Sequence, residues 1–242
     1  MNTGSSTVNV NNGTLIFAAV PGGSISIGNL SVAASASAMI TAATTNSPTT
    51  LSVNTLSITG GVLDVSNNKV LINYGSSPDP ISTIFSQIAS GYANGEWNGT
   101  GINSSVAQID SSYGLGYADS ADPNNPAGLA SGQIEILYTL LGDANLDGKV
   151  NGIDFNLMAA DFNQAVTNGW DQGDFNYDGK VNGIDFNLMT ANFNQAAQIA
   201  VPGVVSAPAT TTTTASDSSD NNVVSTVLGT HAAKKPKHGR KI

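Results

Sequence analysis

The 242-residue sequence contains no cysteine, which excludes disulfide bonds and any site built on a thiolate. Charged residues are scarce, at 10% of the chain. The residues before position 234 include only three lysines, and no arginine, but 17 acidic residues. The part of the chain able to fold is therefore acidic, and we expect no binding to nucleic acid.

Long apolar runs are also missing. No stretch of about 18 apolar residues occurs, so we expect no transmembrane helix. The start, MNTGSSTVNV, has neither a basic n-region nor an apolar h-region, and no signal peptide is visible. The Gly-, Ser-, Thr- and Asn-rich composition is nevertheless typical of extracellular β proteins. We therefore expect a protein of the extracellular space or the bacterial cell surface, and interpret the chain as a piece of a longer protein or of a truncated gene.

Histidine is confined to positions 231 and 238, so the first 230 residues offer no Ser-His or Cys-His nucleophile. Glycoside hydrolysis would need a pair of carboxylates. Outside two acidic loops described below, the candidate acids are Asp64, Asp79, Glu96, Asp110, Asp119, Asp122 and Glu135. Tyr92, Trp97, Tyr113 and Tyr117 are candidates for stacking on carbohydrate, although core packing is the favoured interpretation. We predict that the chain is not an enzyme.

Residues 1–76 alternate apolar residues with Ser, Thr and Asn, as half-buried strands do. ISIGNLSV (25–32) and LSVNTLSI (51–58) share a template at a spacing of 26 residues, and VNVNNGTLI (8–16) aligns with LDVSNNKVL (63–71). Repeats of this length are typical of a parallel β-solenoid, in which each rung buries its inner face against the next. An ordinary β-sandwich is the alternative.

The rest of the chain divides into three further parts. Residues 77–140 form a connecting or capping segment, with a helix expected over 80–92, turn-rich sequence after it and a strand over 133–141. Residues 141–196 hold the two acidic loops. Residues 197–242 are Thr/Ser-rich and end in the basic stretch KKPKHGRK, and we expect a disordered linker with a solvated tail; adhesion to an anionic surface is the alternative for the tail.

The acidic loops carry the clearest chemical signal. GDANLDGKVNGIDFNLM (142–158) is repeated as GDFNYDGKVNGIDFNLM (173–189), and 19 of 23 positions agree between 142–164 and 173–195. Oxygen side chains at positions 1, 3, 5, 9 and 12, a main-chain carbonyl at 7 and glycine at 6 suit Ca²⁺, which takes six to eight oxygen ligands. The predicted ligands of the two ions are Asp143, Asn145, Asp147, Lys149 (carbonyl), Asn151 and Asp154, and Asp174, Asn176, Asp178, Lys180 (carbonyl), Asn182 and Asp185. Asn/Asp/Gly turns without an ion are the alternative.

Each loop is followed by an apolar helix but is not preceded by one, and position 12 holds Asp. In this pattern residues 142–195 resemble a type I dockerin, a paired module of Ca²⁺ loop and exit helix. The resemblance implies binding to a cohesin-like protein through loop positions 10 and 11, which are Gly152, Ile153, Gly183 and Ile184 here. The exit helices lack the Lys and Arg that dockerins place toward cohesin, so docking within the chain or onto the cell surface is the alternative.

Within the first exit helix, Ile153, Leu157 and Ala160 form one apolar stripe, and Phe155, Met158 and Phe162 form another. We expect both to pack against the sibling repeat. The segment GYANGEWNGTGINSS before the module is similar to sequence found before dockerin-like repeats in bacterial surface proteins with autotransporter-associated β-strand repeats.

The sequence thus predicts a mainly β protein, with a parallel β-solenoid-like N-terminal part and a small α module of two Ca²⁺ loop–helix repeats. The predicted function is non-catalytic assembly or attachment at a cell surface. A dockerin-bearing accessory of polysaccharide degradation, binding cohesin or carbohydrate, is the alternative.

Overall fold

The structure is a computed structural model that describes residues 6–167 and 169–200, and this part of the chain is mainly β, as predicted. Its strands are β1 (Thr7–Val10), β2 (Gly13–Phe17), β3 (Ser24–Ser26), β4 (Asn29–Val32), β5 (Ala36–Ile40), β6 (Thr50–Val53), β7 (Thr55–Ile58), β8 (Val62–Asp64), β9 (Lys69–Asn73), β10 (Gly101–Asn103), β11 (Tyr113–Asp119) and β12 (Gln133–Leu140). Its helices are α1 (Ile81–Tyr92), the short 3-10 helix η1 (Ala93–Gly95), α2 (Gly152–Ala160) and α3 (Gly183–Ala191). The expected basic tail at 234–241 lies outside the described residues.

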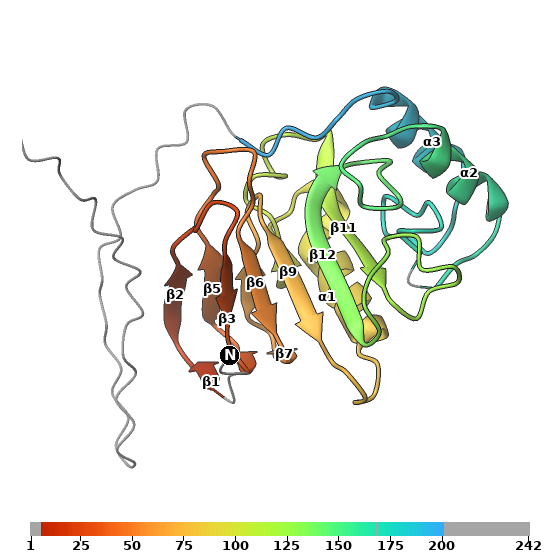
Figure 1. Cartoon of the computed structure of the whole chain (residues 1–242). Helices are drawn as coiled ribbons and strands as arrows, with labels where there is room; N and C mark the ends of the chain where they lie inside the picture. The colour runs from red at the N-terminus through yellow and green to blue at the C-terminus, as the bar shows by residue number, and fades with distance from the viewer. Residues whose placement is uncertain (1–5, 168, 201–242) are drawn as a thin grey trace, which may run out of the picture. The chain divides into compact units, whose positions relative to one another are not determined.

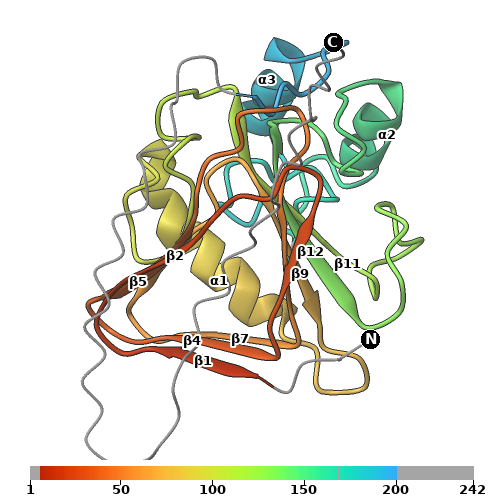
Figure 2. The same cartoon turned by 60° about the vertical axis from the view of Figure 1, so that its left-hand side comes forward.

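The strands stack into three sheets, which Figure 2 shows as the sides of a triangle. Their strand orders are β1-β4-β7, β10-β8-β5-β2 and β11-β12-β9-β6-β3. The pairs among β1 to β10 are parallel, because the chain passes through the other sheets before it returns to the same one. The strands of successive turns therefore lie side by side, as Figure 1 shows.

The register of the strands tests the predicted repeats. Ile25 lies opposite Leu51 and Leu30 opposite Leu56, so the spacing of 26 residues is confirmed. The second alignment, of 8–16 with 63–71, is wrong, because β1 and β8 belong to different sheets. The turns differ in length, and a fixed period does not hold along the chain.

The space between the sheets is filled by alternate residues of each strand. In β5, for example, Ala36, Ala38 and Ile40 are buried while the residues between them are partly exposed. Each fully buried aliphatic side chain contributes about 1.5–3 kcal/mol. Among the described residues the buried side-chain oxygens of Asn103 and Tyr117 lack a hydrogen-bond partner. The buried Asn67 side chain is satisfied, since it accepts a hydrogen bond from the Ala43 amide at 2.6 Å and donates one to the Ala43 carbonyl at 2.9 Å.

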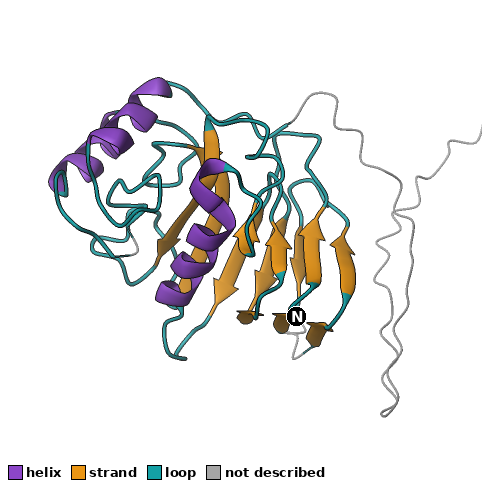
Figure 3. Ribbon diagram, turned by 180° about the vertical axis from the view of Figure 1, so that it is seen from behind, coloured by secondary structure: helices purple, strands orange, loops and turns teal. Residues whose placement is uncertain are grey.

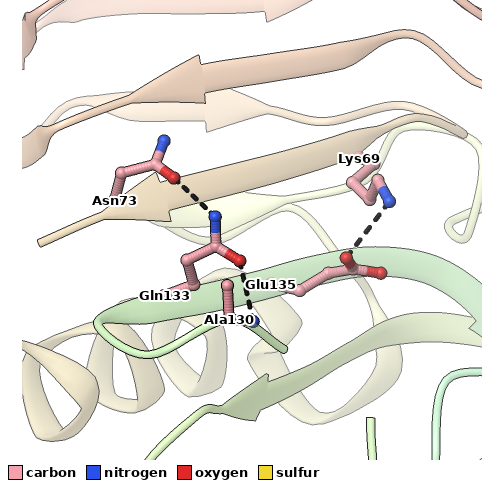
Figure 4. Close-up of polar contacts among 5 residues, drawn as sticks. All are labelled: Lys69, Asn73, Ala130, Gln133 and Glu135. Atoms are coloured by element: carbon pink, nitrogen blue, oxygen red, sulfur yellow. Dashed lines mark hydrogen bonds and ion pairs between the residues drawn. The ribbon is translucent and has the colours of Figure 1, made fainter. Parts of the chain in front are cut away.

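The third sheet changes from parallel to antiparallel where β12 joins β9, and Figure 4 shows the polar contacts at this junction. Lys69 Nζ lies 3.1 Å from Glu135 Oε2, and the Gln133 amide donates to Asn73 Oδ1 at 2.8 Å. Gln133 also accepts from the Ala130 amide at 3.1 Å. These contacts favour the register in which β12 continues the stack.

Helix α1 confirms the helix predicted over 80–92. It lies over the end of the triangular space, as Figures 2 and 3 show, and buries Ile84 and Ile88 in the core. Its close approach to β10 depends on Gly91, since a Cβ there would lie 2.0 Å from the Ile102 carbonyl oxygen. No helix in the described ranges is both long and apolar enough to cross a membrane.

Strand β10 lies in sequence that we predicted to be turn-rich, and β11 lies in sequence for which we predicted no element. β11 is buried along its whole length and pairs antiparallel with β12. Its sequence, YGLGYAD, contains Gly114 and Gly116, a residue type that is typical of turns. Both glycines instead make room for side chains of the segment that contains the acidic loops, which lies beyond this end of the sheet in Figure 1.

Candidate metal centre

The first acidic loop, residues 143–154 (loop 1), is organised by hydrogen bonds from its own backbone to its acidic side chains. Asp143 accepts the amide of Asp147 at 3.1 Å on Oδ1 and that of Gly148 at 3.0 Å on Oδ2. Asn145 accepts the Asp147 amide at 3.1 Å, and Asp147 accepts that of Lys149 at 2.9 Å. The chain turns back at Gly148, whose φ of +81° is accessible to glycine at little cost.

The last residue of loop 1 joins the loop to its exit helix. Asp154 Oδ1 accepts the amides of Ala144 and Asn145 at 2.9 and 3.2 Å, and its Oδ2 accepts the Asn151 amide at 2.9 Å. The Asn151 side chain in turn accepts the Ile153 amide at 2.8 Å and caps α2. A ligand on Asp154 would therefore act on both ends of the loop and on the start of the helix.

Loop 2, residues 174–185, repeats this network. Asp174 accepts the amides of Asp178 and Gly179 at 3.1 and 2.9 Å, and the amide of Lys180 donates to Asp178 at 2.9 Å. Asp185 accepts three amides at 2.9–3.3 Å, and Asn182 caps α3. In both loops the ligands predicted at positions 9 and 12 thus form hydrogen bonds at the start of the exit helix.

The donor chemistry of the loops fits a calcium ion. Among the described residues no three carboxylate or imidazole groups gather closely enough to hold a metal by themselves. Each site would therefore need the amide oxygens of Asn145 or Asn176 and the carbonyl of Lys149 or Lys180 beside its carboxylates. Ca²⁺ accepts such mixed sets of hard oxygen ligands, whereas Mg²⁺ demands near-ideal octahedral geometry. The backbone hydrogen bonds hold the carboxylates in place for that role.

The electrostatics of the loops point the same way. Burial raises the pKa of Asp143 to about 7 and that of Asp174 to about 6. Burial also raises the pKa of Asp154 and of Asp185, and neighbouring loop carboxylates contribute in the same direction. In each loop the ionised carboxylates repel one another, and a divalent cation would remove that repulsion.

Each loop is paired with the end of the other repeat. Val150, at position 8 of loop 1, exchanges backbone hydrogen bonds of 2.8 and 3.0 Å with Asn194 and Gln195, which follow α3. Val181, at position 8 of loop 2, does the same with residues 163 and 164, which follow α2. Both valines are fully buried. The two loops thus support one another across the module, and the order of one depends on that of the other.

Aromatic residues attach the module to β11. Tyr177, at position 4 of loop 2, accepts the Leu115 amide and donates to the Leu115 carbonyl, both at 3.1 Å. The Trp170 ring stacks on Tyr177 at 5.6 Å, and a Cβ on Gly116 would lie 2.8 Å from its Nε1. The Asn192 side chain also donates to the carbonyls of residues 112 and 141. The core of the module is therefore shared with the β part.

Residues 197–200, which we expected to begin the linker, lie against the β part as well. The Asn67 side chain donates to the Ile199 carbonyl at 2.5 Å, and the Ala200 amide donates to Asn46 at 2.9 Å. The amide of Gln198 donates to the Tyr113 hydroxyl at 2.9 Å. The segment that follows α3 is thus held against the β part by residues far from it in the sequence.

The predicted partner-binding residues lie on the first turns of α2 and α3. Ile153 and Ile184 are 56% and 55% exposed, and Gly152 and Gly183 are exposed too. Our expectation that both helix stripes pack on the sibling repeat is wrong in part, since only Met158 and Met189 are buried there among the apolar residues. Each repeat instead exposes three large apolar side chains, which we call the apolar triplets: Ile153, Phe155 and Phe162, and Ile184, Phe186 and Phe193.

The other candidate residues have structural surroundings. Trp97, Tyr113 and Tyr117 are buried, which confirms core packing, and Tyr92 packs against Trp97 with ring centroids 5.2 Å apart. Glu135 is paired with Lys69. Three residues that hold the loops were not predicted: Thr139, Trp170 and Tyr177. A sequence signal existed for Tyr177, because position 4 is among the few that differ between the loops.

Comparison with known families identifies the module. Residues 141–194 match the family model of the dockerin type I domain, which confirms the predicted resemblance. The match supports a calcium-binding, non-catalytic module that mediates protein–protein assembly, and type I dockerins bind Ca²⁺ in their repeats. Such domains are typically extracellular or attached to the cell surface. No curated protein and no solved structure matched the chain.

Proposed function

We propose that this chain is a calcium-dependent assembly protein that binds one Ca²⁺ in each of its two loops. The hydrogen-bond networks that hold the position-1 and position-12 carboxylates carry this proposal, because they recur in both loops almost bond for bond. The ligands are the twelve residues predicted from the sequence, with Lys149 and Lys180 contributing their main-chain carbonyls.

Isothermal titration calorimetry of the full chain should give about two Ca²⁺ per molecule. Replacing Asp143 and Asp174 together by Ala should abolish the binding heat, because each position-1 carboxylate holds two amides of its loop. Asp161→Asn is the matched control, since it removes an acidic charge of the module outside both loops. An intact chain that takes up no calcium would show that the loops are only hydrogen-bonded turns.

The affinity for calcium should also fall with pH. Protons compete with the ion at Asp143 below about pH 7 and at Asp174 below about pH 6, and burial is the main cause of both raised pKa values. The calcium-free chain should show the opposite trend. Between about pH 7 and 4 its folded state binds protons that the unfolded state does not, so acid stabilises it. Calorimetry at several pH values, with thermal melts in chelator, measures both trends.

The partner docks on the first turns of α2 and α3, at Gly152, Ile153, Gly183 and Ile184, and on the apolar triplets beside them. Neither exit helix carries Lys or Arg, so the docking surface is apolar rather than charged. A cohesin-like protein with an apolar docking surface is the proposed partner; docking within the chain or onto the cell surface is the alternative.

Because the two repeats present the same residues, a single substitution should leave one docking face intact. We expect Ile153→Asp or Ile184→Asp alone to weaken binding to a cohesin by about twofold and the double variant to weaken it more than about tenfold, since a buried, unpaired charge is costly. Biolayer interferometry against a panel of purified cohesin domains, with and without calcium, measures this. The matched control is Asn156→Asp with Asn187→Asp, which adds the same charges at exposed positions of the same helices. Cohesin binding that survives the double Ile variant would place the partner elsewhere.

For the rest of the chain we propose a short parallel β-solenoid over residues 1–76 with a connecting segment over 77–140. The parallel pairing of β1 to β9 supports the solenoid. The composition supports an extracellular or cell-surface location in a protein of the autotransporter-repeat type. In this arrangement the β part presents the module over residues 141–196 at its end.

A second candidate function is that of an accessory in polysaccharide degradation. It is favoured by a groove of about 350 Å³ on the sheet of β2, β5, β8 and β10, where amides and hydroxyls surround a small apolar floor. Its polar lining residues include Thr14, Ser37, Asp64, Asn98, Asn103 and Gln108. Retention of the full chain on a plant or algal polysaccharide would support this second function. Loss of that retention in Asn98→Ala would assign the polysaccharide binding to the groove.

A further inference from the structure

Thr139 distinguishes the surroundings of two loops that are nearly identical in sequence. It is fully buried near the end of β12, four residues before Asp143, and its hydroxyl donates to Asp143 Oδ2. The same oxygen accepts the Gly148 amide. In loop 2 the residue four positions before Asp174 is Trp170, which has no hydroxyl.

A second contact from outside loop 1 adds to this difference. Trp170 Nε1 donates to the main-chain carbonyl of Asp143 at 2.8 Å, and Trp170 is fully buried. Within the described ranges, the side chain of Asp174 accepts hydrogen bonds only from Asp178 and Gly179, both members of its own loop. The Asp143 side chain is thus fixed by the β part as well as by its own loop, while the Asp174 side chain is fixed by its own loop.

These contacts restrict the Asp143 carboxylate. Rotation about its Cβ–Cγ bond would break the hydrogen bonds of Oδ2 to both Thr139 and Gly148, so Oδ1 stays on the side of the Asp147 amide, inside the loop. Rotation of the Asp174 carboxylate would break one bond fewer. A ligand that is already ordered loses less entropy on binding, and hydrogen bonds to a charged group are the stronger kind.

We propose that Thr139 is a positioning residue for loop 1, which makes loop 1 the tighter of the two calcium sites, so that the ions bind in order, loop 1 first. The inference rests on the proposed calcium function. Because ordering one side chain on binding costs up to about tenfold in an equilibrium constant, the two sites should differ by up to about that factor.

The test is a calcium titration of the ¹⁵N-labelled full chain at pH 8, where proton competition is small, followed by NMR at the amides of Gly148 and Gly179. Each amide donates to the position-1 carboxylate of its own loop and so reports one site. In the wild type the Gly148 signal should reach its bound position at up to about tenfold lower free calcium. Thr139→Val should remove this lead, and Thr139→Ser, which keeps the hydroxyl, should restore it. Thr190→Val, at an exposed threonine of α3, is the control and should change neither signal.

Simultaneous saturation of both loops in the wild type would overturn the proposal. So would an equal loss of affinity at both loops in Thr139→Val, since a merely structural role would produce that result. The wild-type titration decides the order of binding even if Thr139→Val fails to fold. If neither glycine signal responds to calcium, the proposed calcium function itself is wrong, and the inference fails with it.

Discussion

In excess chelator, backbone amides of residues 142–195 should exchange with solvent at least about a hundredfold faster than in calcium, while those of β4 to β9 keep their protection. The segment carries eight Asp and two Lys, a net charge of −6. Within each loop neighbouring carboxylates raise one another's pKa, so their ionised forms repel. Two calcium ions would reduce the net charge to −2.

The binding free energy should therefore appear largely as folding free energy of this segment. Each ion would join a loop to its exit helix through Asp154 or Asp185. The reciprocal pairing of Val150 and Val181 with the ends of the opposite repeats would carry the order of one loop to the other. Loss of both ions should thus release most of the module and not just the loops.

Hydrogen–deuterium exchange of the full chain, read by peptide mass spectrometry, measures this result. The parallel strands act as the internal control, because their backbone bonds do not involve the loops. The Leu115 amide is a useful boundary, since it donates to Tyr177 and not to a neighbouring strand. It should lose protection together with the module. Unchanged exchange over 142–195 in chelator would mean that the apolar contacts hold this fold without the ions.

The sequence predicted the features that local chemistry determines. The loop ligands were predicted from residue type and spacing and stay a prediction. The register of β3 on β6 and of β4 on β7 followed from a template of side chains repeated at 26 residues. The capping of α2 and α3 by Asn151 and Asn182 is likewise a local arrangement.

The features that sequence reasoning missed depend on contacts between distant segments. No strand was predicted over 113–119, where Gly114 and Gly116 leave the space that Trp170 and Tyr177 fill. Ile153 and Phe155 were expected to pack on the sibling repeat but are exposed. Helical periodicity identifies an apolar stripe but does not say whether a neighbouring element covers it. The pKa of Asp143, raised to about 7, is another case, because it results mainly from burial, which residue type and spacing do not show.

Trp170→Ala should lower the free energy of unfolding of the calcium-bound chain by about 3–5 kcal/mol, the usual cost of removing a fully buried large aromatic side chain. Trp170 is fully buried and contacts Phe175 and Tyr177, with ring centroids 5.1 and 5.6 Å away. Its indole also donates to Asp143, so the substitution leaves a buried carbonyl without that partner. The side chain joins loop 1, loop 2 and β11, and its loss should separate the unfolding of the module from that of the β part.

Urea denaturation in calcium measures the effect, with circular dichroism at 222 nm for both proteins and fluorescence for the variant. The chain has two tryptophans, so in Trp170→Ala the fluorescence reports Trp97 alone, which is buried beside Tyr92. The Trp97 ring also packs on Tyr177 of loop 2, with ring centroids 5.9 Å apart. The wild type should therefore unfold in one transition, whereas the Trp97 signal of the variant should change in two steps, the first together with the loss of helical signal. Phe162→Ala is the matched control, because it removes a large aromatic residue of the same module that is 40% exposed, and it should cost less than about 1 kcal/mol. A cost for Trp170→Ala as small as that of the control, with coincident transitions, would show that the contacts of Trp170 do not couple the module to the β part.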